Sequence, residues 1–325
     1  MEKVRVGGHQ YSDPDVISLI RATGALVDPR SSVIHQARQL IALYREFAGS
    51  TNRSLERITI LASMAGLEVA PMDVRNRASG RMAAVLIPTG NTRGKKGQIL
   101  YDPRASSGRI VFSIAHEIAH TFFPNTSPGA RFRGLCTSDS REANELERLC
   151  DLAASELVMP LEEFRAEARN DFRLQAIPCL SEIFGSSYEA TVFRLATANP
   201  GIACAGLLRC RWKKNEKQLL DARANQLSLL NTGSSVEELP EPKYRRQSFH
   251  SSAECGEEYV IRWNKSFDPT SCFYSAARTN EIFSSVESLP SLSRAPGLLQ
   301  AVQAPFQREE AHTENPDILF FWVKL

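Results

Sequence analysis

The chain has 325 residues, of which 42% are apolar and 23% charged, and its formal net charge is +2. This length predicts two domains, and this composition predicts a real hydrophobic core. The near-neutral charge excludes a global attraction to nucleic acid or to membranes, so only local clusters could carry one.

The sequence contains no apolar run near the ~20 residues that a membrane span requires. The N-terminus, MEKVRVGGHQYSDPD, also lacks the apolar core and cleavage site of a secretory signal. We therefore expect a cytoplasmic protein. Seven cysteines are present, an odd number with no C-x-x-C pair, which predicts neither a disulfide framework nor a zinc knuckle.

The first half of the chain alternates helix and strand patterns. Apolar residues at three- and four-residue spacing, capping serines and terminal Gly or Pro predict the helices, and short apolar runs between turn residues predict the strands. The predicted elements are helices 31–49 and 54–66, strands 82–88 and 98–103, helices 106–123 and 141–159, and helices 161–169, 173–184 and 187–197.

The pattern changes at Asn199-Pro200-Gly201, after which β-type segments dominate. A polar stretch, 231–247, is predicted as a long loop or linker. The β-type segments are 203–212, 257–263, 271–278, 298–306 and 318–325. We therefore predict an α+β protein with a domain over 1–170, a helical connector over 171–200, and a mixed, β-rich domain over 201–325.

The segment 112–123, FSIAHEIAHTFF, places His116 and His120 four residues apart on a predicted helix. Residues i and i+4 share one helix face, so both imidazoles can reach one ion. Glu117 lies about 100° further around the helix, from where its carboxylate can reach a water at that ion. This spacing of two ligands and one general base is typical of zinc peptidases.

A catalytic zinc takes three protein ligands and leaves the fourth position open. The best candidate for the third ligand is Glu147, on the next strong helix, in the segment ERLCD. Asp151 is four residues further on the same face and can accept a hydrogen bond from the other nitrogen of a ligand histidine. Glu142 and Glu145 are alternative third ligands. For the oxyanion, Tyr101 and Arg133 are candidate donors, although each is more often structural.

The runs GRIVFSIAHEIAH and ERLCDLAASELVMP resemble the ImmA/IrrE family of zinc metallopeptidases. The resemblance extends loosely over residues 30–200. It implies a zincin-like domain with zinc held by His116, His120 and Glu147, and Glu117 as the base. The sequence departs from the family pattern at Cys150, where a small residue is usual, and at Asp151, where Asn is usual.

The resemblance further implies a site-specific endopeptidase that cleaves a helix-turn-helix repressor and so derepresses stress or phage-defence genes. One alternative is a regulatory binding protein with a structural or silent zinc site, and another is a broader peptidase or toxin. Glu117 argues against a silent site, because such a site needs no base.

Two further hypotheses concern regulation. Cys136 lies between His120 and Glu147, and its thiolate would hold the enzyme inactive by taking the open zinc position. Residues 201–325 would form a sensor domain, comparable to a GAF-like domain. Its basic segments 209–214 and 243–246, interleaved with aromatic residues, would bind single-stranded DNA as an activator.

Overall fold

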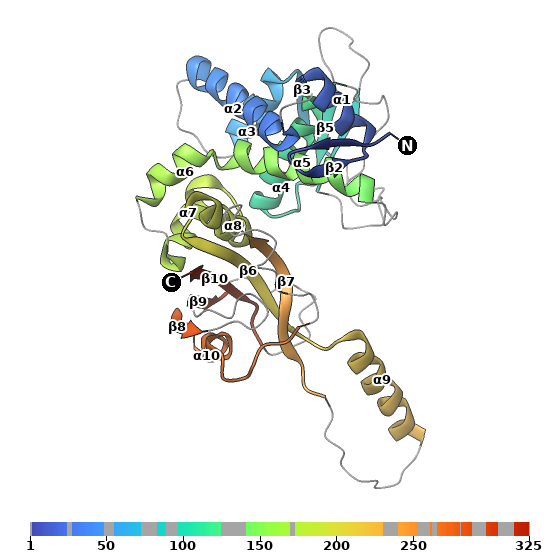
Figure 1. Cartoon of the computed structure of the whole chain (residues 1–325), viewed down its shortest axis with the longest axis vertical. Helices are drawn as coiled ribbons and strands as arrows, with labels where there is room; N and C mark the ends of the chain where they lie inside the picture. Colours follow the sequence, from blue (N-terminus) through green and yellow to red (C-terminus); the bar gives the residue numbers. More distant parts are fainter. Residues whose placement is uncertain are drawn as a thin grey trace. The chain divides into compact units, whose positions relative to one another are not determined.

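Two compact units make up the chain (Figure 1). The structure is a computed structural model of the whole chain, and it describes residues 2–24, 28–48, 55–72, 83–88, 97–124, 141–169, 173–229, 240–251, 261, 265–279, 281–287, 297–304 and 315–324. Unit 1 comprises Met1–Arg169 and Cys179–Ser187, and unit 2 comprises Asn170–Pro178 and Tyr188–Leu325. The segment predicted as a connector, 171–200, is thus divided between the two units.

Unit 1 begins with a small antiparallel hairpin followed by three helices. These elements are β1 (Val4–Val6), β2 (His9–Tyr11), α1 (Pro14–Ala22), α2 (Pro29–Ala48) and α3 (Leu55–Met64). Helix α1 is capped by Asp13, whose side chain accepts hydrogen bonds from the next backbone N–H groups. The sequence patterns predicted α2 and α3 but gave no sign of the hairpin or of α1.

A three-stranded sheet follows, in the order β3-β5-β4. Its strands are β3 (Leu67–Pro71), β4 (Ala84–Pro88) and β5 (Gly97–Tyr101). The pair β3 and β5 is parallel, whereas β4 is antiparallel to β5 and forms an edge of this sheet. Helix α4 contacts both β4 and β5.

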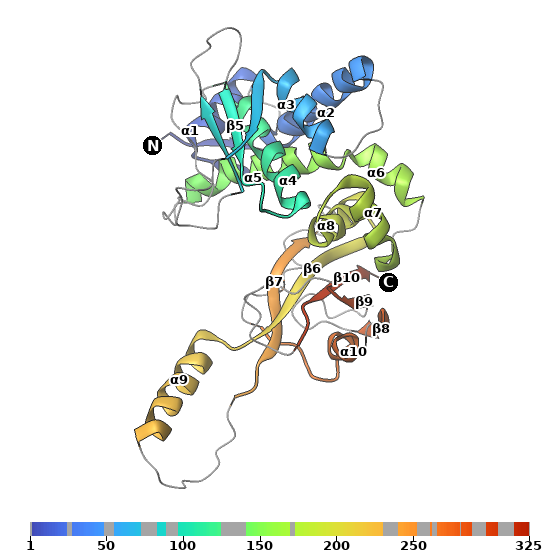
Figure 2. The ribbon, with the colours of Figure 1, turned by 180° about the vertical axis from the view of Figure 1, so that it is seen from behind.

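The remaining helices of unit 1 include the two that carry the predicted site, α4 and α5, which pack side by side (Figures 1 and 2). They are α4 (Ser107–Ala119), the short helix η3 (His120–Phe122), α5 (Arg141–Val158) and α6 (Leu161–Ala168). The second half of α4 is buried continuously from Ser113 to Ala119, which makes it a central rather than a surface helix. Further along the chain lie η4 (Leu174–Ala176), α7 (Ile177–Phe184) and α8 (Tyr188–Ala198).

Unit 2 is built on a five-stranded antiparallel sheet with the order β7-β6-β10-β9-β8. Helices η4 and α8 belong to this unit. Its later elements are β6 (Ile202–Arg211), α9 (Lys214–Leu229), β7 (Lys243–Ser251), α10 (Cys272–Arg278), β8 (Phe283–Glu287), β9 (Gly297–Gln303) and β10 (Ile318–Lys324). The α+β class and the β-rich C-terminal part, both predicted from the sequence, are confirmed. Among the described residues, no helix is both long enough and apolar enough to span a membrane.

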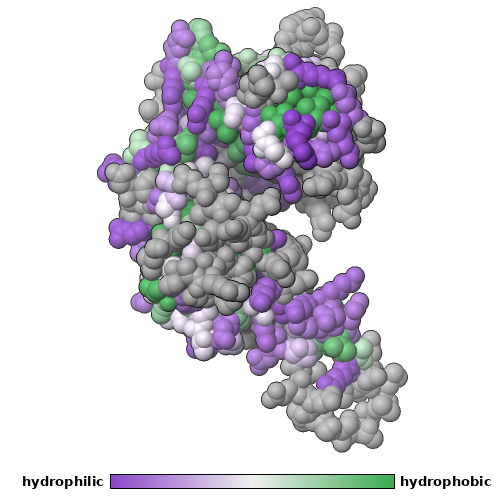
Figure 3. Space-filling model, viewed as in Figure 1, coloured by the Kyte–Doolittle hydropathy of each residue, from purple (hydrophilic) through white to green (hydrophobic). Residues whose placement is uncertain are grey.

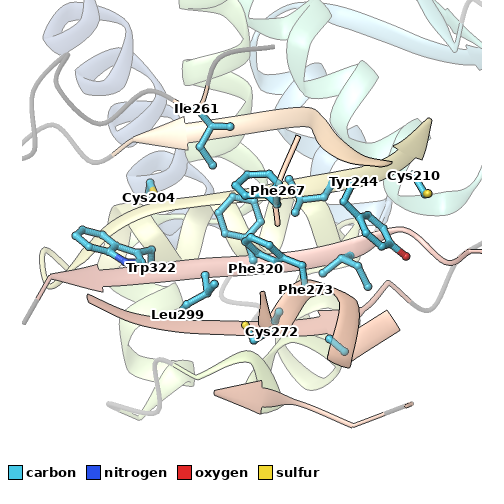
Figure 4. Packing of buried hydrophobic residues seen from close by; sticks show 14 of the residues in the cluster. Cys204, Cys210, Tyr244, Ile261, Phe267, Cys272, Phe273, Leu299, Phe320 and Trp322 are labelled. Atoms are coloured by element: carbon cyan, nitrogen blue, oxygen red, sulfur yellow. The ribbon is translucent and has the colours of Figure 1, made fainter. Parts of the chain in front are cut away.

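The core of unit 2 lies against one face of this sheet and contains several of its aromatic residues, including Tyr244, Phe273 and Trp322 (Figure 4). Gly297 on β9 leaves room for the fully buried Trp322 indole. A Cβ atom at Gly297 would lie 2.1 Å from Trp322 Cε2, so no larger residue fits without rearrangement. Helix α9, by contrast, has a mostly hydrophilic surface (Figure 3).

Two predictions for unit 2 were wrong. The segment 271–278, predicted as β-type, contains helix α10, in which Phe273 and Ala276 are buried at helical spacing. The stretch predicted as a loop over 231–247 ends inside β7, which begins at Lys243. A short apolar run does not distinguish strand from helix by periodicity, and a charged strand is recognised only once its partner, here β6, is known.

Candidate metal centre

The predicted site lies entirely within unit 1, between α4 and α5. His116 and His120 are 0% and 2% exposed, and their rings meet edge to face with centroids 5.0 Å apart. His116 lies on α4, and His120 is the first residue of η3, directly after α4. Because i and i+4 positions project from the same side of a helix, both rings lie on the side that packs on α5. Two buried imidazole rings thus face the same side of α5.

Glu147 on α5 faces both rings. Its Oε2 lies 3.1 Å from His116 Nε2, and its Oε1 lies 3.8 Å from His120 Nε2. Around a tetrahedral zinc ion with ligand bonds of 2.0–2.1 Å, neighbouring ligand atoms are about 3.4 Å apart. The two separations bracket that value, and two imidazoles with one carboxylate form a donor set that zinc accepts.

Asp151 holds the other side of the first imidazole. Its Oδ1 lies 2.9 Å from His116 Nδ1. An ionised carboxylate only accepts hydrogen bonds, so Nδ1 carries the proton and the lone pair of Nε2 points towards Glu147. This is the arrangement that orients a ligand histidine in metal sites.

Glu117 is 1% exposed. Its Oε2 accepts a hydrogen bond of 3.1 Å from the backbone N–H of Leu86 on β4. A buried carboxylate without a donor would be strongly destabilising, so this contact between strand and helix helps to fix the Glu117 side chain. Sequence reasoning missed Leu86, because a backbone donor leaves no signal in residue types.

A second cluster shares the two histidines. Among the described residues, His116, His120 and Cys150 form a group whose candidate ligand atoms all lie within 4.8 Å of one another. Cys150 is fully buried, and its Sγ lies 3.5 Å from His120 Nδ1. Glu147 is not part of this group, although its two oxygens lie 3.1 Å from His116 Nε2 and 3.8 Å from His120 Nε2.

We favour Glu147 over Cys150 as the third donor, since the Nε2 atoms of both rings face its carboxylate. Cys150 instead contacts the opposite nitrogen of His120. The signal for Cys150 was present in the sequence, because it follows Glu147 by three residues on the same helix face.

The other candidates have different surroundings. Glu145 accepts hydrogen bonds from Ser12 N–H and Oγ–H and from Asp13 N–H, so it supports the start of α1. Tyr101 ends β5 and is partly exposed. Cys136 and Arg133 lie outside the described residues, as does the side chain of Glu142.

The comparison with family models agrees with this local picture. Residues 69–196 match the family model described as the IrrE N-terminal-like domain (Peptidase_M78), a span that includes all of α4 and α5. No curated protein matches the chain. Among solved structures, a Mycobacterium tuberculosis transcriptional regulator matches at 15% identity and a TM-score of 0.49, over 91% of this chain and 92% of that chain.

The family match rests on residues 69–196. It spans both histidines, Glu117 and Glu147. Residues 69–196 therefore match an IrrE N-terminal-like domain, the domain of the ImmA/IrrE metallopeptidase family.

Proposed function

We propose that this protein is a zinc-dependent, site-specific endopeptidase that cleaves a helix-turn-helix repressor and thereby derepresses stress or phage-defence genes. The observation that carries the peptidase part is the convergence of His116, His120 and Glu147, with the buried carboxylate of Glu117 one residue from the first histidine. The repressor substrate rests on the family resemblance.

In this proposal His116, His120 and Glu147 hold the metal, and Asp151 orients His116. Bound there, zinc would polarise the scissile carbonyl and lower the pKa of a water molecule. Glu117 takes the proton of the attacking water and delivers it to the leaving amine. The hydrogen bond from Leu86 N–H holds Oε2 of this carboxylate.

The first observation needed is whether a small helix-turn-helix protein is encoded beside this one, and the central experiment incubates the zinc-loaded protein with that candidate substrate. Glu117→Gln keeps the size of the side chain but cannot act as a base, so we expect cleavage to fall about 10²–10⁴-fold while zinc stays bound. Glu46→Gln, an exposed residue of α2, is the matched control and should cleave like wild type. Equal cleavage by Glu117→Gln and wild type would refute the mechanism.

The same assay separates the alternatives. Cleavage of many unrelated proteins would favour a broad peptidase or toxin. Tight binding of the repressor without cleavage, and with zinc present, would favour a regulatory protein whose metal is structural.

We propose two modes of regulation. Cys136 would act as an inhibitory zinc ligand, and a Cys136→Ser variant with unchanged basal activity and zinc coordination would contradict this. Unit 2 would be a GAF-like sensor, which its antiparallel sheet with α10 packed against β8 and β9 allows.

Activation by single-stranded DNA is the proposal that the residues of unit 2 support least. Tyr244, Phe267 and Phe273 are core residues, so they cannot stack on bases at the surface. Arg209 and Arg245 are ion-paired with Asp317 and Glu216. Exposed lysines and arginines would therefore have to make the contacts with DNA. If the protein has no affinity for single-stranded DNA at either low or moderate salt, the proposal is wrong.

A further inference from the structure

Each imidazole of the metal centre lies between two residues of α5. His116 has Glu147 at Nε2, 3.1 Å away, and Asp151 at Nδ1, 2.9 Å away. His120 has Glu147 at Nε2, 3.8 Å away, and Cys150 at Nδ1, 3.5 Å away. The two rings are held in the same way, except that the outer partner is a carboxylate for one and a thiol for the other.

The surroundings of the thiol are apolar. Cys150 belongs to a buried cluster with Ala119, Phe123 and Leu149, among others, and it is fully inaccessible. In such surroundings an imidazole N–H that lacks an acceptor destabilises the folded state, because its lost hydrogen bonds to water are not replaced. Sulfur is a weak acceptor, but it is an acceptor.

We propose that Cys150 is a positioning residue, which accepts a hydrogen bond from Nδ1–H of His120 and so selects the tautomer whose Nε2 lone pair faces Glu147. This inference rests on the proposed zinc site. It gives a physical role to one of the two positions at which the sequence departs from the family pattern, and it makes Cys150 the counterpart of Asp151.

The geometry argues against Cys150 as a ligand of the same ion. Its sulfur lies beside Nδ1, and the lone-pair directions of the two imidazole nitrogens diverge. An ion bonded to His120 Nε2 and to Glu147 would therefore lie on the far side of the ring from the sulfur. Cys150 acts on the metal through His120, not directly.

Helix α5 then supplies three functions from one face, because Glu147, Cys150 and Asp151 are spaced at i, i+3 and i+4. Packing of α5 on α4 brings the ligand carboxylate and both outer partners into place together.

The test measures zinc affinity by competition with a chelator for wild type, Cys150→Ala and Cys150→Ser. We expect Cys150→Ala to weaken zinc binding about tenfold, the lower end of the range for outer partners. Cys150→Ser should recover most of this affinity, because its hydroxyl also accepts. The matched control is Cys204→Ala, which removes a fully buried sulfur from unit 2 and should leave zinc affinity unchanged.

Unfolding of the metal-free forms separates positioning from packing. If Cys150→Ala loses stability without zinc but binds zinc like wild type, the role is structural and the inference is wrong. If Cys150→Ala does not fold, Cys150→Val takes its place, because valine fills the space of the thiol without offering an acceptor. We expect its zinc affinity to be about tenfold below that of Cys150→Ser, and equal zinc affinity of these two variants would overturn the inference. A wild-type protein that binds no zinc would overturn the proposed function, and this inference with it.

Cobalt substitution tests whether the sulfur is an outer partner or a ligand. A thiolate bound to Co²⁺ gives an intense near-ultraviolet charge-transfer band, which we expect to be absent in the Cys136→Ser background, where the other proposed sulfur ligand is removed. A band that persists in Cys136→Ser and disappears in the Cys136→Ser/Cys150→Ser double variant would make Cys150 a ligand and overturn the proposal.

Discussion

The two units treat their buried polar side chains differently. In unit 1, His116, His120 and Glu117 are buried next to a helix that presents a carboxylate to both rings. In unit 2, the buried Arg245 is ion-paired with Glu216, and Arg209 makes a two-pronged contact with Asp317, with N–O distances of 3.0 and 2.9 Å. Unit 1 also has ion pairs between helices, such as Arg57 with Glu163. What distinguishes it is that the two imidazoles and Glu147 converge on one point, whereas Arg245 and Arg209 of unit 2 are each paired with a carboxylate of another element.

This difference separates a candidate reaction centre from structural ion pairs. A carboxylate opposite an arginine satisfies both charges and fixes two elements to each other. A carboxylate opposite two imidazole Nε2 atoms forms a ligand set instead. The residue type opposite the buried carboxylate, arginine or histidine, therefore shows where metal binding is expected, whereas burial alone does not.

The largest effect should come from removing a proposed ligand. We expect His116→Ala to lower zinc affinity by more than about 100-fold, beyond the range for outer partners, with unfolding of unit 2 unchanged. All three tryptophans lie beyond residue 188, so tryptophan fluorescence reports on unit 2. Equilibrium dialysis measures the zinc affinity, and fluorescence-detected unfolding measures the stability of unit 2. Unchanged zinc affinity would contradict the assignment of His116 as a ligand.

The next largest effect should come from breaking an ion pair of unit 2, which is expected to change stability and not zinc affinity. Arg209→Ala leaves the Asp317 carboxylate buried without its guanidinium, and we expect a loss of about 2–4 kcal/mol of unfolding free energy. The double variant Arg209→Met/Asp317→Leu should recover much of this loss, since it removes both charges. Denaturant unfolding measures both, and a fall in zinc affinity would show that the two units are coupled.

A smaller effect is expected from the outer partner of His116. Asp151→Asn keeps the shape but offers a weaker acceptor, so zinc affinity should fall about tenfold. The exposed Glu46→Gln again serves as the control. Zinc competition measures the change, and an effect as large as that of His116→Ala would instead make Asp151 a ligand.

The smallest effect concerns His250, on β7 of unit 2. Burial, with a contribution from the Arg194 charge, lowers the pKa of His250 below its usual value of 6.5. Because the unfolded chain then binds more protons below pH 6.5, this histidine makes unit 2 lose stability as the pH falls through that value. His250→Gln should flatten the loss between pH 6.5 and 5, and an unaltered profile would contradict the assignment.

Part of this protein was predictable from its sequence. The helical spacing of His116 and His120, and of Glu147 and Asp151, follows from residue order, because both pairs stand at i and i+4 on patterns with strong helical periodicity. The same local rules predicted helices α2 and α3 and two strands of the three-stranded sheet, β4 and β5. These features depend only on neighbours along the chain.

Tertiary structure decided the rest. The sequence left Glu145 open as a ligand, and only the chain path shows that it supports Ser12 while Glu147 faces the histidines. Likewise, the contacts of Leu86 with Glu117 and of Cys150 with His120 join residues about 30 positions apart. Such contacts depend on how helices and strands pack, which short-range periodicity does not encode.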